Sequence, residues 1–271
     1  MSRPLYEELR AALLAGEPVV LATVTRVGEA ATAATALAAK LLVREGSETR
    51  GSLGDPELDR VVERDARAVL DRGVSATRHY GPRGEARRDD VEVFFETFVS
   101  PARLIIFGAV DFTRALVEVA KVLGYAVTVC DARPVFATRA RFARADEVVV
   151  EWPDRYLERV GPSLGPRDAV CVLTHDVKFD VPAVLAALAT PVGYVGAMGS
   201  RRTHEQRWVR LLEAGASEGE LRARLMSPIG LDLGARTPEE TAVAICAEII
   251  AVRAGRVGAR APLRDATGPI H

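Results

Sequence analysis

The sequence is poor in cysteine, has no long apolar run and shows no excess of charge of either sign. Its three cysteines, Cys130, Cys171 and Cys246, are odd in number and lack paired spacing, which disfavours a disulfide framework or a cysteine-based zinc site. The 36 basic side chains nearly cancel the 37 acidic ones, leaving a formal charge of -1. This balance provides no global positive field for nonspecific nucleic-acid binding or for adsorption to an anionic membrane.

The apolar residues are spread through the chain. No run reaches the ~18 residues needed to span a bilayer, and residues 1–10 lack the apolar core of a signal peptide. We therefore expect a cytoplasmic protein. With 271 residues, of which 48% are apolar and 27% charged, the chain has a globular profile and room for one large domain or two modest ones.

The pattern of the chain changes near residue 100, where one apolar run ends and another begins at Leu104. We predict a small α+β domain over residues 1–100, a second domain over 101–257 and an irregular tail over 258–271. In the first domain the apolar periodicity predicts helices over 5–14 and 58–70 and strands over 19–24, 37–43 and 91–95.

The second domain alternates continuous apolar strands with helices, which is typical of a parallel sheet covered on both faces. We predict strands over 104–107, 126–130, 147–150, 169–173 and 192–195, and helices over 112–123, 181–188, 201–214, 218–225 and 238–253. Thr237, Pro238 and Glu240 form a capping-box start signal for the last helix. The fold class is therefore α/β, a Rossmann-like sheet at the C-terminus preceded by a small α+β domain, with ligands expected beyond the carboxyl ends of the strands.

The first strand end of this sheet carries Gly108, Val110 and Asp111. A dinucleotide fold places a second glycine where Val110 stands, and Asp111 would repel a phosphate at the helix start, so ordinary nicotinamide binding is disfavoured. Asp131 ends the second strand about 20 residues later, the placement that holds a ribose hydroxyl.

The fourth strand runs into a polar cluster that contains His175, Asp176, Lys178 and Asp180. These groups can exchange protons or satisfy a polar heterocycle. In the alternative interpretation, Thr174, Asp176 and Asp180 only cap the next helix.

The fifth strand ends in a turn that suits an oxyanion. Ser200 can cap the following helix, and the free N–H groups of the first helical turn, together with Arg201 and Arg202, form a phosphate-binding pattern. Gly196, Met198 and Gly199 belong to the same stretch.

The long loop over 227–240 is interrupted by apolar residues at Ile229, Leu231 and Leu233, which predicts an ordered loop folded over the sheet edge. Arg236 can bind a ligand or pair with Asp232 to hold the loop together. The cysteines lie in apolar segments and are expected to pack as small hydrophobes, and the histidines lack the spacing of metal ligands.

Three stretches carry a specific family resemblance: residues 174–180 (THDVKFD), 194–204 (YVGAMGSRRTH) and 228–240 (PIGLDLGARTPEE). They resemble the XdhC/CoxI family, and the similarity extends to residues 127–133 (VTVCDAR) and to the domain ahead of them. The chain departs from the family pattern at Val110, Asp111 and Val177, and it reads GSLGDPE over 51–57 where members usually have a serine-glycine-glycine-cysteine motif.

The resemblance implies an accessory factor that binds the molybdenum cofactor, assists its sulfuration by a cysteine desulfurase and helps insert it into a xanthine dehydrogenase or CO dehydrogenase-type molybdenum hydroxylase. It also implies a homodimer. In this interpretation Ser200, Arg201 and Arg202 hold the cofactor phosphate, His175 and Lys178 contact the pterin, and residues 230–236 cover it. No catalytic residue and no metal ligand is assigned.

The expected cofactor-binding residues are Gly108, Asp131, His175, Asp176, Lys178, Gly196, Met198, Gly199, Ser200, Arg201, Arg202, Gly230, Asp232, Gly234 and Arg236. Two alternatives remain open. One is an NAD(P)-dependent dehydrogenase that uses His175 or Lys178 for proton transfer and Asp131 at the ribose; the other is a scaffold of the maturation machinery that has lost cofactor chemistry.

Overall fold

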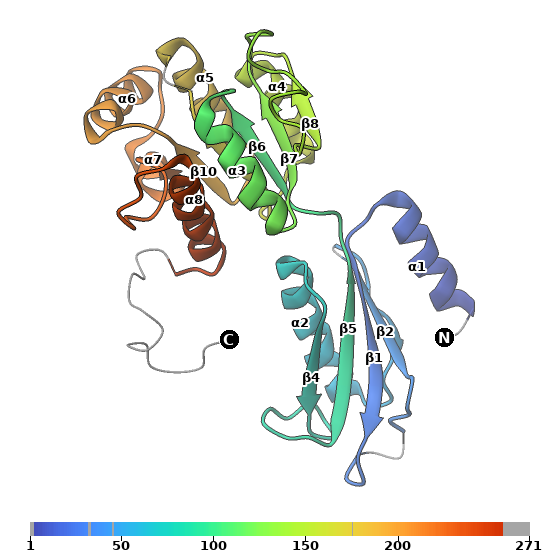
Figure 1. Cartoon of the computed structure of the whole chain (residues 1–271). Coiled ribbons are helices and arrows are strands. Elements are labelled where there is room, and N and C mark those ends of the chain that lie inside the picture. The colour runs from blue at the N-terminus through green and yellow to red at the C-terminus, as the bar shows by residue number, and fades with distance from the viewer. Residues whose placement is uncertain (1–2, 32–33, 45, 175, 257–271) are drawn as a thin grey trace. The chain divides into compact units, whose positions relative to one another are not determined.

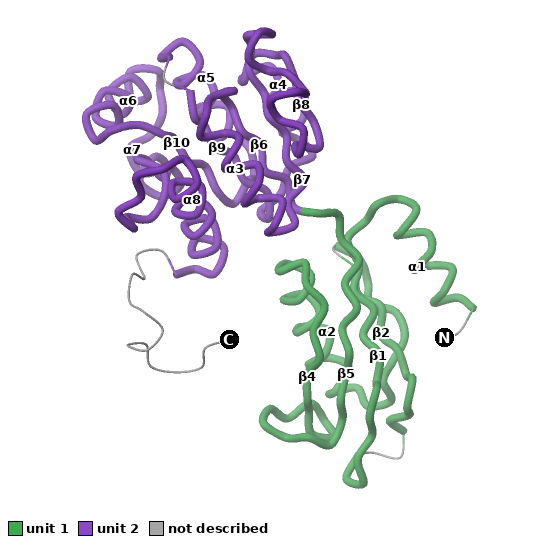
Figure 2. Tube along the Cα trace, in the orientation of Figure 1, with its two compact units in different colours: residues 1–101 green, residues 102–271 purple. Residues whose placement is uncertain are grey.

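The structure is a computed structural model that describes residues 3–31, 34–44, 46–174 and 176–256. The chain divides into two compact units, residues 1–101 and 102–271 (Figure 2). The predicted irregular tail over 258–271 lies outside the described residues. Within the described ranges, no helix is both long and apolar enough to cross a bilayer.

The first unit is an antiparallel sheet of five strands in the order β3-β2-β1-β5-β4, with one helix packed on each face (Figure 1). Alternate residues of the central strand β1 point to opposite faces, so Val20 and Ala22 pack with the helix α2 while Val19 and Leu21 pack with α1. The elements are α1 (Arg3–Ala15), β1 (Val19–Val27), β2 (Lys40–Arg44), β3 (Arg50–Ser52), α2 (Pro56–Arg72), β4 (Ala76–Tyr80) and β5 (Val91–Phe98).

The second unit is built on a six-stranded sheet in the order β11-β10-β9-β6-β7-β8, in which every pairing is parallel. If β6, β7, β8, β9, β10 and β11 are renumbered 1 to 6 and the sheet is read from β8 to β11, the strand order is 3-2-1-4-5-6. This is the order of a doubly wound dinucleotide fold. This confirms the predicted Rossmann-like sheet. The strands are β6 (Arg103–Phe107), β7 (Ala126–Cys130), β8 (Glu147–Val149), β9 (Ala169–Val172), β10 (Tyr194–Ala197) and β11 (Leu225–Met226).

Helices cover both faces of this sheet (Figure 1). Along β6, Leu104 and Ile106 pack with the helices α3 and α8, whereas Ile105 and Phe107 pack with the helices of the opposite face. Such a two-sided core explains why the strands read as continuous apolar runs. The helices are α3 (Asp111–Val122), α4 (Pro153–Val160), the 3-10 turn η1 (Gly161–Ser163), α5 (Val177–Leu188), α6 (Arg201–Glu213), α7 (Glu218–Arg224) and α8 (Pro238–Arg253).

Most predicted elements are present, with shifted ends. Helix α5 begins at Val177, four residues before the predicted start, because Asp176 caps it by accepting a hydrogen bond from the Lys178 N–H at 3.1 Å. The capping box at Thr237 is confirmed, and the three cysteines are buried as expected. Four elements that are short or rich in polar residues were not predicted from the sequence: β3, β4, α4 and β11.

Candidate functional site

The crevice of the doubly wound sheet lies between β6 and β9, because the chain leaves these adjacent strands toward opposite faces. Gly108 follows β6 with a φ of 108°, and a Cβ atom built on it would lie 2.9 Å from the backbone nitrogen of Thr174, which follows β9. A side chain at Gly108 is therefore excluded both by the backbone conformation and by this close approach. The tight packing places the ends of β6 and β9 directly against one another.

Asp131, at the end of β7, is fully occupied by protein donors. Its Oδ1 accepts from the backbone N–H and Nε of Arg133 at 3.0 and 2.9 Å, and its Oδ2 accepts from Arg133 Nη2 and the Ala109 N–H, both at 2.8 Å. A carboxylate offers about four acceptor positions. No acceptor position therefore remains for a ribose hydroxyl while Arg133 keeps this arrangement.

Burial alone would raise the pKa of the Asp131 carboxyl, but the hydrogen bonds from Arg133 and Ala109 outweigh burial and hold the pKa below its usual value. The carboxylate thus ties the turn after β6 to the turn after β7 as a permanent anion near neutral pH.

A buried network joins the loops after β9 and β10. Asp180 is 4% exposed, accepts from Thr174 Oγ1, and pairs with Arg207 Nη2 at 2.9 Å. The same Arg207 nitrogen donates to the Met198 carbonyl at 2.7 Å, and Arg207 Nη1 donates to Ser227 Oγ at 3.2 Å. The interpretation of Asp180 as a helix cap is wrong, since Asp176 has that role and Asp180 lies one turn further along α5.

Arg207 is a structural residue of this region that was not predicted from the sequence. It lies on the buried side of α6 with Leu211, four residues later. The sequence does contain a signal for it, since Arg207 lies four positions before Leu211 and therefore on the same apolar face of the helix. A charged side chain on a buried helix face needs a partner of opposite charge.

The turn after β10 leads directly into the capped start of α6. Ser200 caps α6 by accepting from the Thr203 N–H at 3.2 Å. Arg201 and Arg202 are exposed, and within the described residues neither guanidinium makes a hydrogen bond or an ion pair. Two uncommitted positive charges therefore lie in the first turn of a 13-residue helix.

The polar cluster after β9 is partly described. His175 lies outside the described residues. Asp176 and Lys178 are exposed, with Lys178 Nζ 3.5 Å from Asp176 Oδ2 and 4.8 Å from the centre of the Phe179 ring. The side chains of Lys178 and Asp176 are 60% and 51% exposed.

The loop after β11 is anchored in its first half. The Gly230 N–H and the Tyr194 hydroxyl both donate to Glu248 Oε2, at 2.8 and 2.6 Å, and Ile229 packs onto the core. A Cβ on Gly196 would lie 2.5 Å from Ile229 Cδ1, so this glycine makes room for the loop.

The second half of this loop is more exposed than predicted. Leu233 is 58% exposed, so this apolar side chain does not pack against the sheet in the way that a loop folded over the sheet edge predicts. Asp232, Gly234 and Arg236 are exposed, and no ion pair joins Arg236 to Asp232 within the described residues. The structure therefore provides no support for the Asp232 pairing.

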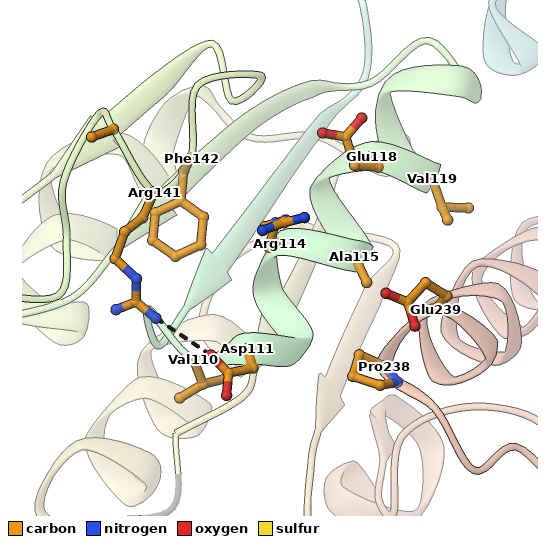
Figure 3. Close-up of a pocket in the computed structure, with 11 residues that line it drawn as sticks. Val110, Asp111, Arg114, Ala115, Glu118, Val119, Arg141, Phe142, Pro238 and Glu239 are labelled. Carbon is orange, nitrogen blue, oxygen red and sulfur yellow. Dashed lines mark ion pairs between the residues drawn. The ribbon is translucent and has the colours of Figure 1, made fainter.

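A pocket of about 630 Å³ lies beside the start of α3 (Figure 3). Val110, Asp111 and Arg114 line one side of it, and the beginning of α8 lines another. Arg141 Nη2 lies 3.5 Å from Asp111 Oδ1, and Arg141 Nη1 donates to the Ala109 carbonyl at 3.1 Å. Arg141 thus offsets part of the repulsion that Asp111 alone would exert on an anion.

In the first unit, the segment 51–57, which departs from the family motif, runs from the end of β3 through a short turn into the start of α2. Asp55 caps α2 by accepting from the Glu57 and Leu58 N–H groups, and Ser52 donates to Asp59 at 2.7 Å. Gly54 has a φ of 107°, and a Cβ there would overlap the Ala34 carbonyl. Among the described residues, no group of three or more His, Cys, Asp or Glu side chains could hold a metal ion.

Comparison with protein families gives two matches. The model of the XdhC Rossmann domain matches residues 104–249, and the model of the XdhC and CoxI family matches residues 12–81. The two matches fall in different units of the structure.

Curated relatives match with moderate identity. The chain is 33% identical over 161 residues to a Bacillus subtilis protein that is named as a probable subunit of xanthine dehydrogenase, and the match covers 59% of this chain and 46% of that protein. It is 36% identical over 85 residues to the molybdenum cofactor insertion chaperone PaoD of Escherichia coli, covering 31% of this chain and 26% of that protein. The chain spans less than half the length of these relatives.

A solved structure supports the fold. The crystal structure of a xanthine dehydrogenase from Bacillus halodurans aligns with a TM-score of 0.53 at 22% identity, covering 94% of this chain and 97% of that one. At this identity the likeness concerns the fold alone.

Proposed function

Because this chain belongs to the XdhC and CoxI family, we propose that it is an accessory protein that binds the molybdenum cofactor, assists its sulfuration and helps insert it into a molybdenum hydroxylase. The cofactor is a pterin that carries a dithiolene and a phosphate. One matched relative is named as part of a xanthine dehydrogenase and another as a cofactor insertion chaperone, which favours a hydroxylase of the xanthine or CO dehydrogenase type as the partner.

The observation that carries this proposal is the turn at Ser200. It places Arg201, Arg202 and the N–H groups of the first turn of α6 at the carboxyl edge of the sheet, and these donors fit a phosphate. In the proposal they bind the cofactor phosphate, Lys178 and His175 contact the pterin, and the exposed half of the 230–236 loop covers it.

The cysteines bear on the source of sulfur. All three are buried, and burial raises the pKa of the Cys130 thiol to about 12 and that of Cys246 to about 11. A thiol must ionise and reach solvent to carry a persulfide. In the proposal the sulfur therefore comes from a cysteine desulfurase, and this chain holds and shields the cofactor during the transfer.

The dehydrogenase alternative meets a specific obstacle. In a dinucleotide site the acidic residue at the second strand accepts the ribose hydroxyls, but here Arg133 and Ala109 occupy the acceptor positions of Asp131. Val110 also stands where the dinucleotide turn needs a glycine. These contacts favour the accessory role over an NAD(P)-dependent dehydrogenase.

The test is equilibrium binding of freshly released molybdenum cofactor to the purified protein. The bound pterin is oxidised and measured by fluorescence after gel filtration, with NADH as a parallel ligand. Stoichiometric pterin without NADH retention is the expected result. NADH retention without pterin would reject the proposal in favour of a dehydrogenase, and a pull-down that recovers a hydroxylase or desulfurase without any pterin would favour the scaffold.

A further inference from the structure

Three aromatic rings lie just beyond the carboxyl ends of β7, β8 and β9, at the same edge of the sheet as the proposed site. They are Phe136, Trp152 and Phe179, and with Arg133 they form a surface that we call the ring platform. Trp152 is 46% exposed and Phe136 is 38% exposed. Phe179 is only 4% exposed and is in ring contact with Trp152.

Close contacts make the ring platform continuous. The rings of Trp152 and Phe179 have centroids 4.9 Å apart at an interplanar angle of 48°. The guanidinium carbon of Arg133 lies 4.6 Å from the centre of the Phe136 ring and 5.9 Å from that of Phe179. Arg133 thus bridges two rings, and Trp152 extends the row beyond them.

Arg133 is held in one orientation. Its Nε and Nη2 donate to both oxygens of Asp131 at 2.9 and 2.8 Å, and Asp131 is 3% exposed. A bidentate pair fixes the plane of a guanidinium as well as its position. The side chain of Arg133 is still 41% exposed, so a fixed planar cation is available for stacking.

The surroundings favour a flat, apolar-faced ligand. Val135, Val150 and Val177 come from the same three segments and are 72%, 50% and 42% exposed. The partly exposed side chains of Trp152, Phe136 and Arg133 are stabilised when a planar ring system covers them, since stacking and cation–π attraction add to the burial of apolar area. Lys178 Nζ, 4.8 Å from the Phe179 ring centre, adds a donor at the border of this surface.

We propose that the ring platform is a stacking site for a planar heteroaromatic ring, with Trp152 as its main contact. The inference deepens the proposed function and rests on it for the identity of the ring, which is the pterin or the nucleobase of a dinucleotide form of the cofactor. The chemistry that both rings share is a flat system with an apolar face.

The experiment compares ring binding by wild type and three variants of the full chain. The probes are pterin-6-carboxylate, CMP and GMP, each measured by equilibrium dialysis. Trp152→Leu removes the aromatic face and Trp152→Phe keeps one. Trp208→Leu is the matched control, because Trp208 is the second of the chain's two tryptophans and lies on α6, where it contacts His204.

The expected result is that at least one probe binds to wild type and that Trp152→Leu weakens its binding about tenfold or more. Trp152→Phe recovers most of the affinity, and Trp208→Leu matches wild type. A pterin-specific effect assigns the pterin to the platform, and an effect confined to CMP or GMP assigns the nucleobase. Circular dichroism checks that each variant is folded. If Trp152→Leu does not fold, an Arg133→Gln variant replaces it in the comparison with wild type and Trp152→Phe. Arg133→Gln is also expected to bind the probe more weakly than wild type.

Two results overturn the proposal: no probe binds to wild type at millimolar concentration, or all variants bind with wild-type affinity. Retention of the molybdenum cofactor on gel filtration separates this inference from the proposed function. Equal cofactor retention by wild type and Trp152→Leu rejects the platform and leaves the function standing. Ring binding that depends on Trp152 in a protein that never retains the cofactor rejects the function and leaves the platform standing.

Discussion

Arg207 and Asp180 form a buried ion pair, with 2.9 Å between Nη2 and Oδ2 and with side chains that are 3% and 6% exposed. The pair joins α6 to α5, and the Arg207 bond to the Met198 carbonyl also fixes the end of β10. The turn at Ser200 is thus positioned by Arg207, a residue of the helix that this turn begins.

Removing one member of this pair is expected to destabilise the second unit. Arg207→Met leaves the Asp180 carboxylate buried without its cation, which costs about 3–5 kcal/mol in the free energy of unfolding. Urea unfolding followed by circular dichroism measures the loss. Glu218→Ala breaks an exposed pair with Arg222 and serves as the control, with an expected loss of about 1 kcal/mol or less; equal losses for both variants would contradict the structural role.

The pairing of Asp131 with Arg133 predicts a pH-dependent contribution to stability. The pKa of Asp131 is lowered in the folded state, because the hydrogen bonds from Arg133 and Ala109 outweigh burial. This stabilisation is fully present above the unfolded pKa of about 3.9 and is lost as the pH falls through the folded pKa. Unfolding of wild type and Arg133→Ala is therefore expected to differ at pH 7 and to converge in acid, and a difference that grows on acidification would refute the assignment.

The proposed function predicts that the turn at Ser200 binds the phosphate of the cofactor. Replacing Arg201 and Arg202 together with alanine should weaken binding of the molybdenum cofactor by an order of magnitude or more, since charge-assisted hydrogen bonds contribute ~1.5 to 3 kcal/mol each. Arg210→Ala, an exposed change later on the same helix, should leave the affinity unchanged. If the double variant binds the cofactor with wild-type affinity, the placement of the phosphate at this turn is wrong.

The buried thiols predict slow reaction with alkylating reagents. Burial raises the pKa of Cys130 to about 12 and that of Cys171 well above its usual value. Native protein at pH 7.5 is expected to take up iodoacetamide far more slowly than protein unfolded in urea, as measured by mass spectrometry. Rapid labelling of a cysteine in the native protein would reopen the question of whether this chain carries sulfur.

A comparison of two glycine positions distinguishes the cost of backbone strain from the cost of steric overlap. Gly108 and Gly234 both have positive φ, 108° and 75°, but a Cβ on Gly108 meets the Thr174 backbone at 2.9 Å whereas one on Gly234 meets nothing within 4 Å. Gly234→Ala is expected to cost about 1 kcal/mol of stability, and Gly108→Ala more than that. Thermal unfolding of the two variants gives the comparison, and a Gly108→Ala protein as stable as Gly234→Ala would show that the crevice can widen.

Local signals in the sequence accounted for much of the second unit. The capping residues Ser200 and Thr237 act within one helical turn, so their partners can be read from neighbouring positions. The starts of α6 and α8 were predictable for that reason. The start of α5 was misplaced because either Asp176 or Asp180 could have capped it on sequence grounds, and only burial distinguished them.

The sequence by itself predicted most strands and helices of the second unit, since apolar runs and helical periodicity reflect the burial of each segment on its own, but it did not predict α4 and β11. It also determined the family, through the motifs at 174–180, 194–204 and 228–240. The tertiary structure alone decided which distant side chains meet: Asp180 pairs with Arg207, 27 positions away, and the Trp152 ring contacts the Phe179 ring. Such contacts depend on how the sheet brings the ends of separate strands together. A local sequence pattern contains no information about which distant residues become neighbours in this way.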